Sequence, residues 1–358
     1  MVALKVLDST GAGYVSNVLS ALDWCVQNKN TYGIRVINMS LGHATVESSA
    51  TDPLCAAVRQ CVQAGIVVVC SAGNKGKNTA GNLVYGGIST PGNEPAALTV
   101  GASNTVETIA RGDDLICSYS SRGPTAVNLH SKPDLVAPGN KIVSLRSVGS
   151  HLDTLYPTNR VTEYSNYYTL SGTSMAAPQV AGTLALMLQA NPQLIPNMVK
   201  AVLQYTAEDL RPKNSLNIEL SKGLKLLTQG AGNLNTIAAV QAAQVINPLV
   251  PVGQSWLSAP LPVSSVIGGG VVLCSQQLFH RDRRMSGANI LAVRQALFSA
   301  TVLWGDTVLW GDGTVSENNE VDTDAPAWSS QVLWGDNVLW GDSATYGDSL
   351  QGNLLFGD

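Results

Sequence analysis

The sequence has 358 residues, of which 45% are hydrophobic and 13% charged, and its formal net charge at pH 7 is -4. This length is sufficient for one large domain with its own core and an additional segment. The low charge content and slightly negative balance exclude the basic surface that nucleic-acid binding requires. The sequence therefore predicts a globular protein without a nucleic-acid partner.

The first part of the chain alternates apolar strands with helices. Apolar runs at 2–7, 34–40 and 66–71 predict strands, and the segments 14–30 and 52–65 have the apolar spacing of helices. Near-continuous apolar strands separated by helices are typical of a parallel sheet that is covered on both faces. We therefore predict an α/β fold whose ligand site lies at the carboxyl ends of the strands.

The six cysteines form neither a CxxC pair nor, with histidine, a cluster at zinc-ligand spacing. Cys25 lies in a helical pattern and Cys70 ends the apolar run GIVVVC. We expect free thiols in the core rather than a disulfide framework. The sequence indicates no metal site and no cofactor.

Neither a signal peptide nor a membrane span is predicted. The opening run is broken by Lys5 and Asp8, as in a buried strand followed by a turn. Residues 249–274 carry no charge, but their prolines and a triple glycine are incompatible with a membrane helix. We interpret residues 246–300 as a flexible or extended linker.

Ser174 stands in the run SGTSMAAP, at the start of an apolar helical segment. Two interpretations fit: a nucleophile at a helix N-terminus, where the dipole favours developing negative charge, or an N-cap serine. Asn74 follows the strand at 66–71 and fits either an oxyanion donor or a turn-forming Asn-Lys-Gly.

Five motifs in order, VINMSLG, VVVCSAGN, YSSRGPT, KPDLVAPG and SGTSMAAPQVAG, resemble the subtilisin family of serine proteases. The resemblance covers residues 1–245, which we interpret as a partial subtilisin-like peptidase domain. It implies a parallel sheet with helices on both faces and a serine endopeptidase with a polypeptide substrate. It also implies that Ser174 is the nucleophile and Asn74 the oxyanion donor, and that the protein is extracellular or in the cell envelope.

The same resemblance implies two substrate-binding segments. One would hold an extended substrate through main-chain hydrogen bonds, and the other would form a wall of the P1 pocket. Broad specificity with an apolar or aromatic P1 residue is the corresponding expectation. The matching residues are Ser40, Leu41 and Gly42 in the first segment, and Ser71, Ala72 and Gly73 in the second.

The family places its catalytic Asp and His before the strand that residues 2–7 match. Among possible substitutes, Asp8 precedes a turn, Asp134 has an expected structural role, and His43 fits the rim of the site better than a base. We expect that the chain alone turns over little substrate and that an upstream polypeptide completes the catalytic domain. The other histidines lie in no matching context: His130, His151 and His280.

Two other functions remain open on the sequence. The sheet could serve as a non-catalytic peptide-binding or surface-interaction platform. A nucleotide-binding protein is a third interpretation, but no glycine-rich phosphate loop follows the first strand.

Residues 301–358 contain VLWGD units that repeat every six residues, which predicts short strands in hairpins or a small solenoid, with disorder as the alternative. We interpret this segment as a separate tail that docks to a protein, a carbohydrate or the cell envelope through its tryptophans. Calcium binding is an alternative that no clear ligand cluster supports. The aspartates at the six-residue step are Asp306, Asp312, Asp336, Asp342 and Asp348.

Overall fold

The computed structural model describes residues 1–212, 219–250, 255–280, 283–287 and 291, and short strands between 307 and 340. Its central sheet combines parallel strands with one short antiparallel strand, β4, which pairs with β3. The sheet contains β1 (Val36–Met39), β2 (Val67–Ser71), β3 (Leu98–Asn104), β4 (Leu115–Ile116) and β5 (Leu135–Pro138).

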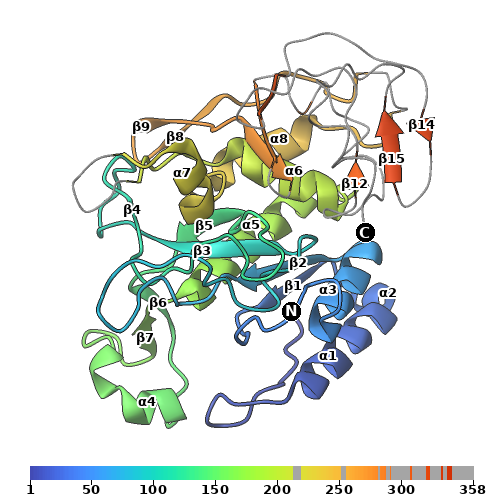
Figure 1. Cartoon of the computed structure of the whole chain (residues 1–358). Coiled ribbons are helices and arrows are strands. Elements are labelled where there is room, and N and C mark those ends of the chain that lie inside the picture. The colour runs from blue at the N-terminus through green and yellow to red at the C-terminus, as the bar shows by residue number, and fades with distance from the viewer. Residues whose placement is uncertain are drawn as a thin grey trace.

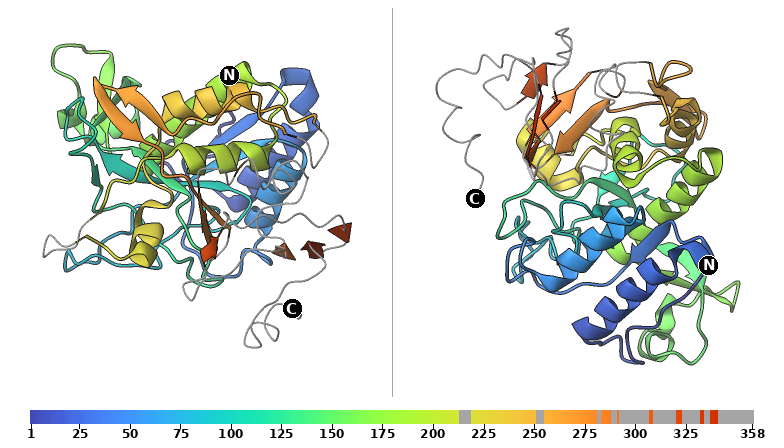
Figure 2. Two further views of the ribbon diagram at one scale, coloured as in Figure 1. Left: turned by 90° about the horizontal axis from the view of Figure 1, so that it is seen from above. Right: turned by 90° about the vertical axis from the view of Figure 1, so that its right-hand side faces the viewer.

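Helices cover both faces of this sheet, and alternation along β2 explains why. Val67 and Val69 belong to a core that includes residues of α5, α6 and α8, whereas Val68 and Cys70 pack with α1 and α3. Figures 1 and 2 show blue α1 and α3 on one side of the strands and α6 and α8 on the other. The helices are α1 (Val15–Gln27), α2 (Lys29–Tyr32), α3 (Pro53–Gln63), α5 (Thr173–Ala190), α6 (Pro196–Thr206), α7 (Lys222–Gln229) and α8 (Thr236–Val245).

The predicted α/β class with a parallel sheet is confirmed. A capping side chain determines where α3 begins. Asp52 accepts hydrogen bonds from the backbone amides of Leu54 and Cys55. All six cysteines are buried and free, as expected.

The strand predicted at 2–7 is not formed. Val2 and Leu4 are 47% and 38% exposed, and no strand among the described residues pairs with this segment. Apolar residues in an extended run become a strand only where a neighbouring backbone completes the ladder. The strand β1 is formed, but in the described part of the chain it pairs with β2 alone, so the other edge of β1 is open.

Part of the segment 246–300, which we interpret as a linker, packs against the main core. Trp256 is buried in the main core, and its indole N–H donates to the carbonyl of Leu291 at 3.0 Å. The strands β8 (Ser264–Ile267) and β9 (Gly270–Leu273) pair as a hairpin. Residues 255–280 therefore pack as part of the globular body, and a domain boundary at 245 stays a prediction.

A ribbon projects from the body immediately before α5 (Figure 1). The strands β6 (Ile142–Leu145) and β7 (Tyr167–Leu170) pair antiparallel. Between them lie α4 (His151–Leu155) and the short 3-10 helix η1 (Pro157–Asn159). Since β7 ends at Leu170 and α5 begins at Thr173, the ribbon leads directly to Ser174.

The remaining strands form small sheets, and β14 pairs with β15 as an antiparallel hairpin. Most of the 301–358 tail, with the five aspartates of the calcium alternative, lies outside the described residues. Its interpretation as a separate module stays a prediction. These strands are β10 (Gln277–His280), β11 (Arg283–Ser286), β12 (Thr307–Val308), β13 (Glu320–Asp322), β14 (Val332–Leu333) and β15 (Asn337–Trp340).

Candidate active site

Ser174 is the second residue of α5, and Gly172 occupies the N-cap position. The interpretation of Ser174 as an N-cap serine is therefore wrong. Its hydroxyl instead donates to the carbonyl oxygen of Ser40 at 3.1 Å. Ser174 is half-buried, so the first turn of α5 presents a partly accessible hydroxyl beside the end of β1.

A second hydrogen bond joins the same two residues in the opposite sense. The hydroxyl of Ser40 donates to the carbonyl oxygen of Ser174 at 2.7 Å. The loop after β1 and the start of α5 are therefore held together at two points, although the two serines are 134 positions apart in the sequence.

Asn74 follows β2 and reaches the same helix start. Its Oδ1 accepts hydrogen bonds from the backbone amide of Thr173 at 3.0 Å and from the Thr173 hydroxyl at 3.1 Å. Its Nδ2 has no partner among the described residues and lies 3.4 Å from where a methyl group on Gly172 would stand. The Asn74 side chain therefore bonds to α5 and not to the backbone of its own turn. Its amide N–H groups are free to donate.

The other predicted residues lie around this point. Leu41 packs against the core that contains α1 and α3, and Gly42 has no space for a side chain because the carbonyl of Thr90 adjoins it. Ser71 and Ala72 are buried at the end of β2. Gly73 has a φ of +101°, and a side chain there would collide with the Ser89 hydroxyl, so only glycine fits.

No titratable side chain hydrogen-bonds to the Ser174 hydroxyl in the part of the chain that the structure describes. The ring Nδ1 of His43 contacts the carbonyl of Ala44 at 2.9 Å, and its backbone bridges Thr90. The Ser174 hydroxyl donates to Ser40 instead, and no hydrogen bond joins it to His43. The described residues hold a nucleophile candidate and an oxyanion donor candidate without a general base.

Sequence reasoning missed Thr173. Its hydroxyl donates to Asn74 and accepts a hydrogen bond from the amide of Gly73 at 3.2 Å, so it links the β2 loop to α5. The only available signal was its place between Gly172 and Ser174 in the motif.

Asp134 has the structural role that we expected. Its buried carboxylate lies 2.8 Å from Lys132 Nζ and 2.9 Å from Lys200 Nζ. Burial lowers the pKa of Lys200 to about 7, and the two lysines hold the pKa of Asp134 below its ordinary value despite its own burial. The group ties the start of β5 to α6.

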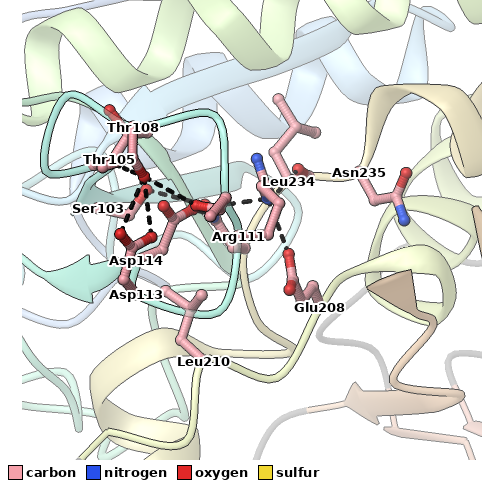
Figure 3. A network of polar contacts seen from close by, with 12 residues as sticks. Ser103, Thr105, Thr108, Arg111, Asp113, Asp114, Glu208, Leu210, Leu234 and Asn235 are labelled. Carbon is pink, nitrogen blue, oxygen red and sulfur yellow. Dashed lines mark hydrogen bonds and ion pairs between the residues drawn. The ribbon is translucent and has the colours of Figure 1, made fainter. Parts of the chain in front are cut away.

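A further polar network surrounds Asp114 (Figure 3). The Asp114 carboxylate accepts a hydrogen bond from Asn233 at 2.9 Å and lies 3.5 Å from the guanidinium of Arg111. Arg111 also pairs with Glu208 at 2.9 Å. Burial raises the pKa of Asp114 to about 6, and Arg111 offsets only part of this effect.

Among the described residues, no group of three or more His, Cys, Asp or Glu side chains could hold a metal ion. In the same part of the chain, no helix has the length and apolar content that crossing a membrane requires.

The sequence profile of the subtilase family, Peptidase S8, matches residues 1–223. The chain belongs to this family of subtilisin-like serine proteases. The subtilase match includes every residue that we assign to the candidate site.

Individual subtilases are similar over the same region. Serine protease AprX of Bacillus subtilis is 40% identical over 209 residues, which cover 57% of this chain and 45% of that protein. The extracellular serine proteinase of a Thermus strain is 34% identical over 59% of this chain and 42% of its own length. The chain thus spans about half the length of these relatives. The solved structure of sphericase has 25% identity and a TM-score of 0.49, over 64% of this chain and 66% of sphericase.

Proposed function

We propose that this chain is part of a serine endopeptidase in which Ser174 Oγ is the nucleophile and Asn74 Nδ2 stabilises the oxyanion. The observation that carries the proposal is the fixation of Asn74 by Thr173. Because Oδ1 accepts two hydrogen bonds from Thr173, Nδ2 stays available beside the first turn of α5. A preorganised donor next to a serine hydroxyl is what acyl transfer requires.

In the proposed reaction, Ser174 Oγ forms a bond to the carbonyl carbon of the scissile peptide, and its proton passes to a general base. The base returns this proton to the leaving amine as the C–N bond breaks, and water then hydrolyses the acyl-enzyme. Asn74 would donate to the negative oxygen in both steps. Its effect is large only where charge develops, so it contributes to kcat rather than to substrate affinity.

We place the base on an upstream polypeptide that completes the catalytic domain. Two observations support this: no titratable group of the described residues contacts the Ser174 hydroxyl, and one edge of β1 is open. An added strand would satisfy the backbone groups of that edge and could bring a histidine to Ser174.

The substrate in this proposal is an extended polypeptide. Ser40, Leu41 and Gly42 would pair with its main chain, while Ser71 to Gly73 would border an apolar or aromatic P1 side chain. For location we propose the extracellular space or the cell envelope, since one relative is named an extracellular serine proteinase. Calcium is not required by the site as proposed.

The test combines the chain with a polypeptide that supplies the upstream part of the catalytic domain, and it measures peptide hydrolysis and labelling by a fluorophosphonate. Ser174→Ala should abolish both. Asn74→Ala should lower kcat by about 10²- to 10³-fold, the loss known for removal of an oxyanion-hole donor in subtilisin. Asn78→Ala is the matched control, because Asn78 caps an exposed turn nearby. Labelling that persists in Ser174→Ala, or an unchanged kcat in Asn74→Ala, would overturn the assignment.

A non-catalytic peptide-binding protein is the second candidate, which the missing base beside Ser174 favours. This second function predicts that peptides bind to the chain when the upstream segment is present, and that neither peptide hydrolysis nor fluorophosphonate labelling follows. Under the endopeptidase proposal, both follow.

A further inference from the structure

The first turns of α5 contain a proline at a position where a helix does not normally accept one. Pro178 lies four residues after Ser174 inside α5. In a regular helix, the amide of residue i+4 donates to the carbonyl of residue i. Proline has no N–H, and its ring presses against the carbonyl four residues earlier. The carbonyl of Ser174 therefore lacks the backbone donor that it would have in a regular helix.

Ser40 supplies the missing donor from outside the helix. Its hydroxyl donates to the Ser174 carbonyl at 2.7 Å. The hydroxyl itself accepts a hydrogen bond from Asn38 Nδ2 at 3.1 Å. With its acceptor side occupied by Asn38, the single Ser40 proton is directed to Ser174. A chain of hydrogen bonds thus runs from β1 through Ser40 to the first turn of α5.

We propose that Ser40 is a positioning residue for Ser174, whose side chain replaces the backbone donor that Pro178 removes. Fixing the Ser174 carbonyl sets the orientation of the Ser174–Met175 peptide plane, and with it the position of the Ser174 Cα atom that carries the side chain. The return hydrogen bond from Ser174 Oγ to the Ser40 carbonyl then selects the side-chain rotamer. This role is additional to the main-chain binding assigned to Ser40 above, and its relevance to catalysis rests on the proposed function.

The hydrogen bond can be observed directly in the full chain, without any activity. Ser174–Met175 is the only Ser-Met pair in the sequence, so labelling serine carbonyls with ¹³C and methionine amides with ¹⁵N isolates one cross-peak. Ser40→Ala should shift the Ser174 carbonyl resonance upfield, since the carbonyl loses its donor. Adding Pro178→Ala to Ser40→Ala should restore the shift, because the new backbone N–H can donate to Ser174.

The matched control is Ser171→Ala. Ser171 accepts a hydrogen bond from the Lys141 amide and makes none with Ser174, so its replacement should leave the cross-peak in place. Circular dichroism of each variant establishes that it is folded. An unchanged resonance in folded Ser40→Ala, or failure of Pro178→Ala to restore it, would overturn the proposal.

The consequence for the nucleophile is measured by labelling with a fluorophosphonate in the presence of the upstream segment. Ser40→Ala should slow labelling by about threefold to tenfold, the equivalent of one lost hydrogen bond, and Pro178→Ala should recover most of the rate. A wild-type rate in Ser40→Ala would contradict the positioning role. Absence of labelling in the wild-type chain would count against the proposed function instead. The Ser174 carbonyl resonance would still show whether the Ser40 hydroxyl donates to that carbonyl.

Discussion

Asp114 is a buried carboxylate with an incomplete set of hydrogen bonds. Its Oδ2 accepts from Asn233, whereas Oδ1 has no partner among the described residues. The nearest cation, Arg111, is shared with Glu208 (Figure 3). The ionised form is therefore poorly compensated, which explains why burial raises the pKa of Asp114 to about 6.

Asp114→Asn should make folding less dependent on pH. The folded pKa of about 6 lies above the ordinary value of 3.8, so this carboxyl stabilises the fold below pH 4 and loses that contribution as pH rises through 6. Relative to wild type, the variant should gain stability at pH 8, by up to about 3 kcal/mol. Urea unfolding at pH 5 and pH 8 measures the difference.

The control is Asp113→Asn, since Asp113 is exposed and interacts with Thr108 at the surface. It should alter the pH profile much less than Asp114→Asn does, because the Asp113 charge is only a minor cause of the raised pKa of Asp114. Equal pH dependence in wild type and Asp114→Asn would show that Asp114 is ionised at little cost in the folded state.

The projecting ribbon depends on side-chain contacts more than on its own helix. The helix α4 has five residues, which is too short for a helix to be stable alone. Asp153 within it is buried and accepts hydrogen bonds from Arg146 at 2.6 Å and Arg160 at 2.8 Å. The backbone amide of Gly149 donates to the same carboxylate. One carboxylate thus joins α4 to both sides of the ribbon.

Asp153→Asn should loosen the ribbon while the central sheet stays folded. The substitution leaves two guanidinium groups without a carboxylate. Amides between 142 and 170 should then exchange hydrogen faster, and limited proteolysis should cut there first. Hydrogen bonds from Arg146 hold the pKa of Asp153 well below 3.8, so lowering the pH of wild type through and below that value should have the same effect.

Glu163→Gln serves as the control, because Glu163 is exposed in the same segment. It should exchange like wild type. Equal protection in Asp153→Asn would mean that strand pairing alone holds the ribbon.

At the scale of the whole molecule, residues after 245 contribute to the main core. Trp256 is buried there beside residues of α5, α6 and α8, and Leu278 joins the same cluster. The body of the protein therefore extends past the end of the family match at residue 223.

Trp256→Ala should destabilise the sheet itself. Truncation of a large buried aromatic side chain costs about 3 to 5 kcal/mol, a large part of the about 5 to 15 kcal/mol that stabilises a typical domain. Chemical denaturation followed by circular dichroism measures this loss. Val266→Ala on the exposed face of β8 should change stability by less than about 0.5 kcal/mol. A chain ending at Val245 that unfolds at the same denaturant concentration as the full chain would instead support a boundary there.

The local pattern of the sequence was sufficient to predict several of the elements. Apolar spacing predicted β1, β2, α1 and α3, because side chains two or four positions apart share a face of a strand or helix whatever the rest of the chain does. The motifs also selected Ser174 and Asn74, and in the structure Asn74 hydrogen-bonds to Thr173, the neighbour of Ser174, while their catalytic roles stay predictions.

Tertiary structure alone decided the pairings between distant segments. Residues 2–7 have a strand pattern but no neighbouring strand, and Trp256 lies in a segment whose prolines and glycines indicate a linker. The contact between Ser40 and Ser174 spans 134 positions. Such contacts depend on strand order and helix placement, which no short-range pattern encodes, and so only the assembled sheet determines which side-chain donor replaces the backbone N–H that Pro178 lacks.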